Sequence, residues 1–189
     1  MTHWIHRALP HHEETNVVFF RGTSLDALTR GLLGLHRRPL AYGKGSDWSL
    51  LMHDMLSWEE NDYGLVGYGP LSTGGAELAV FVTEPCIAKG HCPSFEYYRD
   101  GRLITAFSFD DLFAHPWGEE PDLLLPALTA ARLVGPAADL DGSDVEVRTA
   151  RAVTEFFGLP DLAYDEMAAP GGTGGHGTSA SSGSSASSS

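Results

Sequence analysis

Residues 94–107 read SFEYYRDGRLITAF, and this stretch decides the fold. Two runs rich in aromatic and β-branched residues, 94–99 and 102–107, flank the pair Asp100-Gly101. Such runs are typical of β-strands. Asp-Gly between them is the strongest short-range signal for a tight hairpin, because both turn residues must adopt positive φ. The stretch therefore predicts two adjacent antiparallel strands.

Further strands are expected on the N-terminal side of this hairpin. The run 16–21, NVVFFR, has four consecutive apolar residues and ends at Gly22, which is typical of a buried strand. Alternation in 48–53 predicts a strand with one face more deeply buried than the other. The run 77–83, ELAVFVT, also alternates, and a shorter strand is expected at 40–42.

A helix is expected directly after the first strand. Residues 23–26, TSLD, fit a capping box in which the Thr23 hydroxyl accepts from the backbone N–H of Asp26. Leucines at helical spacing share one face of this helix, namely Leu25, Leu28, Leu32 and Leu35. The helix is expected to end near Gly34.

Two more helices are expected toward the C-terminus. The first covers 123–134, with Pro126 in its first turn. The second follows another capping box at 143–146 and ends at Gly158. Its inward side chains are expected to be Val145, Ala152, Val153 and Phe156.

The order of these elements predicts an α+β fold, because strands cluster between 40 and 107 and helices lie mostly at the ends. We expect one twisted, mainly antiparallel sheet with helices packed on one face. Its apolar side chains between Val17 and Phe157 should form a single interior.

Composition divides the chain into three parts. Residues 1–15 are expected to be a flexible lead-in, and 16–166 a single globular α+β domain of common size. The last part, 167–189, consists mostly of Gly, Ser and Ala after Met167. Such a segment buries too little apolar surface to offset its ordering entropy, so we expect a disordered tail.

Charge and hydropathy exclude several classes of partner. The formal net charge is −13, and such a field repels phosphate backbones, so no nucleic-acid partner is expected. No apolar run approaches the roughly 18 residues that span a bilayer. Residues 1–10 lack a continuous apolar core and a small-residue cleavage site. We therefore expect a cytoplasmic protein without a membrane partner.

The order of motifs resembles an uncharacterised family of small actinobacterial proteins over about residues 16–158. The resemblance implies the domain boundaries and a bacterial cytoplasmic setting, and it implies no catalytic residue. The chain departs from the family pattern at 85–93, where it has its own Cys and His residues. The landmarks are 17–22 (VVFFRG), the strand at Trp48, 71–75 (LSTGG), 97–101 (YYRDG) and 117–126 (WGEEPDLLLP).

The segment 86–92, CIAKGHC, offers three soft metal ligands, Cys86, His91 and Cys92. Zinc prefers four ligands, usually with two to four residues between paired cysteines, and here five residues intervene. A fourth ligand would have to come from elsewhere, for instance His53 or His115. Cys92 could also act as a thiol nucleophile, although adjacent strand residues point to opposite faces. The alternative is a connecting loop with small buried cysteines.

Three other patterns have ordinary structural explanations. His53-Asp54 suggests a histidine oriented by a carboxylate, but it also fits a strand that ends in a polar loop. The acids in 139–146 do not match an EF-hand, and they also suit a helix N-terminus. The glycines in 64–75 precede a strand and lack the phosphate-binding patterns.

Aromatic residues rimmed by acids predict a surface for a protein partner. The alternative is that most of these aromatic residues belong to the core. Tyr97 and Tyr98 face opposite sides of their strand, so one of them should be exposed unless a helix covers it. The densest mixture of acids and aromatics is 58–63, WEENDY. The candidate partner-binding residues are Trp58, Glu59, Glu60, Asp62, Tyr63 and Tyr98.

Two functions remain open at this point. The first is a non-catalytic bacterial adaptor or immunity-like module that binds a protein partner, which the negative charge suggests is basic. The second is a small metal-dependent or thiol enzyme that uses Cys86, His91 and Cys92, with zinc as the metal.

Overall fold

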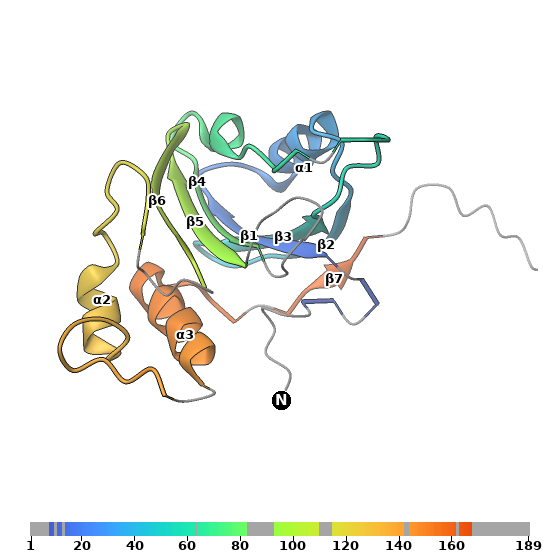
Figure 1. Ribbon diagram of the computed structural model, residues 1–189. Coiled ribbons are helices and arrows are strands. Elements are labelled where there is room, and N and C mark those ends of the chain that lie inside the picture. Colours follow the sequence, from blue (N-terminus) through green and yellow to red (C-terminus); the bar gives the residue numbers. More distant parts are fainter. Residues whose placement is uncertain are drawn as a thin grey trace, which may run out of the picture.

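The chain folds around a central antiparallel β-sheet (Figure 1). The computed structural model describes residues 8–9, 11–12, 14–62, 64–82, 93–109, 115–141, 144–161 and 163–167. Over these residues the sheet has seven strands in the order β6-β5-β4-β1-β3-β2-β7. The strands are β1 (Thr15–Arg21), β2 (Pro39–Gly43), β3 (Ser49–Asp54), β4 (Glu77–Val82), β5 (Ser94–Arg99), β6 (Arg102–Ser108) and β7 (Asp165–Glu166).

The α+β class and the single antiparallel sheet are confirmed, since every neighbouring pair of strands is antiparallel. The β5–β6 hairpin is also confirmed. Asp100 and Gly101 have φ of 54° and 80°, as a tight turn of this type requires. The Asp100 carboxylate accepts from the backbone N–H of Gly75 at 2.7 Å, which ties the turn to the preceding loop.

Helix α1 (Leu25–Gly34) begins one residue later than its capping box predicts. Ser24, not Thr23, is the N-cap, and its hydroxyl accepts from the backbone N–H of Ala27 at 3.1 Å. A short 3₁₀ helix, η1 (Gly69–Ser72), precedes β4.

Helix α2 (Leu125–Ala130) is shorter than the predicted 123–134. Pro126 does lie in its first turn, and Arg132 leaves helical geometry with φ of 56°. Helix α3 (Val145–Phe157) ends at Gly158 in the left-handed conformation, as predicted. The prediction that Phe156 points inward is wrong, because this side chain is 42% exposed. The next residue, Phe157, packs against Tyr97 instead, with ring centroids 4.5 Å apart.

Helices cover both faces of the sheet, so the prediction that they pack on one face is wrong (Figure 1). Val18 and Phe20 contact α1 on one side, which we call the α1 face. Val17 and Phe19 point the other way, to the α3 face, which α2 and α3 cover. Successive strand residues alternate between faces, so the apolar run of β1 supplies both. The predicted single interior is therefore two apolar layers that share one sheet. Burying one such side chain stabilises by about 1.5–3 kcal/mol.

The ends of the described chain also join the core. Ala8 and Leu9, which belong to the expected flexible lead-in 1–15, are buried on the α3 face. Strand β7 pairs with β2, and the backbone N–H of Met167 donates to Leu40. The predicted tail beyond Met167 lies outside the described residues. Among the helices that the structure describes, none is long and apolar enough to cross a membrane.

Candidate functional site

Polar side chains gather at one end of the otherwise apolar α1 face. The strand registers place His53 opposite Asn16, Asn16 opposite Val82, and Val82 opposite Ser94. Residues directly opposite one another in an antiparallel sheet point to the same face. Since Val82 belongs to the apolar layer under α1, the row places His53, Asn16 and Ser94 on that face as well.

Tyr68, from the loop before η1, covers this row and is buried. The His53 Nδ1 atom lies 2.8 Å from the backbone oxygen of Asp54, so Nδ1 carries the proton. In the neutral imidazole, Nε2 then accepts from the Tyr68 hydroxyl at 2.9 Å. The Tyr68 oxygen in turn accepts from Asn16 Nδ2 at 2.8 Å. Burial raises the pKa of Tyr68 well above its ordinary value, so this hydroxyl stays protonated.

The pairing of His53 with Asp54 differs from the one that the sequence suggests. His53 contacts the backbone carbonyl of Asp54, whereas the Asp54 carboxylate faces Arg38 at 4.0 Å. With Nδ1 and Nε2 both engaged, His53 does not offer a free nitrogen as a fourth zinc ligand.

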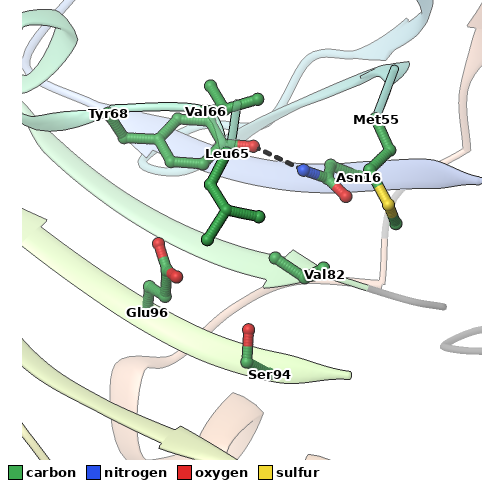
Figure 2. A pocket seen from close by; sticks show the side chains of 8 residues that line it. All are labelled: Asn16, Met55, Leu65, Val66, Tyr68, Val82, Ser94 and Glu96. Atoms are coloured by element: carbon green, nitrogen blue, oxygen red, sulfur yellow. Dashed lines mark hydrogen bonds between the residues drawn. The ribbon is translucent and has the colours of Figure 1, made fainter. Parts of the chain in front are cut away.

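A cavity of about 40 Å³ opens beside Tyr68 (Figure 2). Asn16 is 2% exposed, and its Oδ1 atom accepts no hydrogen bond from any residue of the described chain. The residues that line the cavity are Asn16, Met55, Leu65, Val66, Tyr68, Val82, Ser94 and Glu96.

Glu96 supplies the carboxylate of this cavity. Burial raises its pKa, and the hydroxyl of Tyr98, which donates to Glu96 at 2.8 Å, offsets this only in part. None of the Lys and Arg residues that the structure describes forms an ion pair with Glu96.

The loop after β3 carries most of the predicted partner-binding residues, and we call residues 57–62 the Trp58 loop. The buried guanidinium of Arg37 holds this loop against the end of α1. It donates to the backbone oxygen of Leu35 at 3.0 Å, to the Asp62 carboxylate at 3.3 Å and to the backbone oxygen of Gly64 at 2.9 Å. The C-terminal end of the loop is therefore held by a residue from the connection between α1 and β2.

Within the Trp58 loop, the side chains have different roles. Hydrogen bonds from the Gly64 backbone, from Ser57 and from Arg37 lower the pKa of Asp62 to about 2, so this carboxylate is ionised and serves the loop itself. Trp58 is 47% exposed, and its ring lies 5.5 Å from that of His36. Glu59 and Glu60 are exposed beside it.

The structure thus brings Trp58, Glu59, Glu60 and Asp62 together. Tyr98 lies on β5, three strands away from β3 in the sheet order. It is half-buried because it packs against the ring of Tyr68, with centroids 5.8 Å apart. Its neighbour Tyr97 is buried on the α3 face.

Several predicted residues lie outside the described part of the chain, namely Tyr63, Cys86, His91 and Cys92. The zinc and thiol hypotheses therefore stay predictions. Among the described residues, no group of three or more His, Cys, Asp or Glu side chains could hold a metal ion.

Sequence reasoning missed Asn16, Tyr68 and Ser94 as lining residues. Asn16 and Ser94 are polar residues at inward positions of predicted strands, and this pattern could have indicated a polar site. Their convergence depends on β1, β4 and β5 being neighbours, and the sequence does not predict that order.

Comparisons with protein-family models, with curated proteins and with solved structures find no match for this chain. The resemblance to the actinobacterial family therefore stays a prediction, and the function is argued from the geometry alone.

Proposed function

We propose that this protein is a non-catalytic binding module, of the adaptor or immunity-like kind, that engages a basic protein partner through the Trp58 loop. The main support for the proposal is the set of three hydrogen bonds from Arg37. They hold the end of a loop that presents a half-exposed tryptophan. A preorganised loop loses less conformational entropy on binding, and tryptophan is the residue type most enriched at interface hot spots.

The charge at the Trp58 loop suggests the nature of the partner. A second Trp-Glu-Glu group exists at Trp117, Glu119 and Glu120, and Trp117 is also exposed. There Arg102 pairs with Glu119 at 2.9 Å and Arg99 pairs with Glu120 at 3.3 Å.

Glu59 and Glu60 differ from that second group. Within the described residues, neither has an Arg or Lys partner, and Glu59 has only His36 at 3.8 Å. Their uncompensated charge, on a chain of net charge −13, favours a partner that supplies Lys or Arg.

The test compares the two Trp-Glu-Glu groups. The immobilised full chain is exposed at low salt to a lysate of the organism that produces it. The variant W58A/E59Q/E60Q is compared with the matched control W117A/E119Q/E120Q, which changes the net charge equally. We expect the wild type and the control to retain a stoichiometric basic protein, and the Trp58-loop variant to bind it at least tenfold more weakly.

Thermal unfolding of both variants shows whether they fold. The proposal is overturned if no stoichiometric partner is retained at low salt, or if the Trp58-loop variant binds the partner as tightly as the wild type does.

A further inference from the structure

The cavity beside Tyr68 contains more hydrogen-bond acceptors than donors. The Tyr68 hydroxyl donates its hydrogen to His53, and one of the two Asn16 Nδ2 hydrogens goes to Tyr68, which leaves one amide donor. The acceptors that remain are the Asn16 Oδ1 atom, a carboxylate oxygen of Glu96 and the Ser94 hydroxyl, which can accept or donate. A group that fits this cavity must bring hydrogen-bond donors.

The size of the cavity and the number of its acceptors narrow the class of ligand. A primary ammonium has three N–H donors, which equals the number of acceptors. A hard metal ion requires six or more oxygen ligands, and a guanidinium has five donors on a larger planar group. About 40 Å³ holds two or three water-sized groups, so an ammonium and the carbon attached to it fit.

The cavity is also accessible and lacks a cation from the described chain. The cavity is not fully enclosed, and Leu65, one of its lining residues, is 63% exposed. Figure 2 shows the Glu96 carboxylate and the Ser94 hydroxyl on the same side of the cavity, with Asn16 across from them. A carboxylate in such a place is stabilised by a positively charged donor.

We propose that the Asn16–Ser94–Glu96 cavity is a binding site for a primary ammonium group, either of a free small amine or of a lysine side chain. The site does not depend on the Trp58 loop binding a partner. In it, Glu96 neutralises the charge, while Asn16 Oδ1 and Ser94 accept the remaining N–H groups.

The test is a titration of the full ¹⁵N-labelled chain with methylammonium chloride at constant ionic strength, followed by NMR. We expect saturable shifts of the Asn16 side-chain amide and of the Ser94 backbone amide. In Glu96→Gln, which keeps an oxygen for Tyr98, the dissociation constant should rise at least tenfold. In Ser94→Ala it should rise about threefold.

Two controls separate this site from general attraction to an acidic protein. Tetramethylammonium has the same charge without N–H donors and should give no saturable shift. Glu155→Gln, which removes an exposed carboxylate on α3, should leave the dissociation constant unchanged.

A second titration, with the amide of Nα-acetyl-lysine, identifies the source of the ammonium. Saturable binding supports a lysine side chain, and binding of methylammonium alone supports a free small amine. The proposal is overturned if methylammonium gives only linear shifts equal to those of tetramethylammonium, or if Glu96→Gln binds it as tightly as the wild type does.

Discussion

Glu77 and Glu96 are two glutamates on adjacent strands, and they point to opposite faces of the sheet. Each accepts a hydrogen bond from a tyrosine, Glu77 from Tyr97 and Glu96 from Tyr98. The difference is a cation. Arg21 donates to Glu77 at 2.9 Å, whereas Glu96 has no such partner among the described residues.

The pKa values of the two carboxyl groups shift in opposite directions. Burial by itself raises the pKa of both carboxyl groups. At Glu77 the hydrogen bonds from Arg21 and Tyr97 outweigh burial and hold the pKa below its ordinary value of 4.5. At Glu96 burial prevails and the pKa is raised. At Glu96, which is buried more deeply than Glu77 and lacks an ion pair, the tyrosine hydroxyl does not offset the effect of burial on the pKa.

Removing Arg21, the cation beside Glu77, should change the free energy of unfolding more than the other substitutions below. Arg21→Met leaves Glu77 with Tyr97 and the nearby charge of Arg99, and it also removes the ion pair with Asp47 at 3.0 Å and the guanidinium lying 4.5 Å from the Trp48 ring centroid. We expect the free energy of unfolding to fall by about 2 kcal/mol at pH 7, less than for a fully buried pair, because the Arg21 side chain is 35% exposed.

Urea unfolding measures this change. Arg30→Met is the control, since Arg30 pairs with Asp26 on the exposed surface of α1, and its effect should stay below about 0.5 kcal/mol. Equal effects of the two substitutions would contradict the role assigned to Arg21.

Neutralising the paired glutamate should have a smaller effect of the same sign. Glu77→Gln is expected to destabilise by about 1–2 kcal/mol at pH 7. Because the folded-state pKa of Glu77 is lowered, its contribution is present above 4.5 and is lost as the pH falls through the folded-state value. Unfolding curves of wild type and variant between pH 3 and pH 8 should therefore converge in acid. A difference that stays constant to the lowest pH would argue against the ion pair.

Neutralising the unpaired glutamate should have the smallest effect and the opposite sign. The folded-state pKa of Glu96 is raised, so any cost of its charge appears as the pH rises through that value and is absent below 4.5. Glu96→Gln should therefore stabilise the protein by up to about 1 kcal/mol at pH 8. Thermal unfolding at pH 4 and pH 8 checks this, and a destabilised variant at pH 8 would contradict the absence of a cation.

Local signals predicted much of the fold. Asp100-Gly101 specified the β5–β6 hairpin and Gly158 the end of α3, because each conformation depends on a few adjacent residues. Strand β7 has only two exposed acidic residues, so no apolar pattern indicated it. The apolar run of β1 indicated that both faces of the sheet are covered. Nothing in the sequence indicated how many helices cover each face.

The candidate sites differ in the same way. The Trp58 loop could be predicted because its exposed residues are consecutive, whereas the Arg37 contacts that fix it could not. The cavity joins Asn16, Tyr68 and Glu96, which are far apart in the sequence, and only the strand order brings them together.

The central position of β1 has a consequence for synthesis on the ribosome. Of the strands that the structure describes it emerges first, yet its neighbours β3 and β4 follow only after α1 and β2. Until Val82 has left the exit tunnel, the apolar run of β1 has an unpaired edge, which favours aggregation or capture by a chaperone. Pairing between such distant segments also slows folding, to milliseconds or seconds in proteins where non-local pairs dominate.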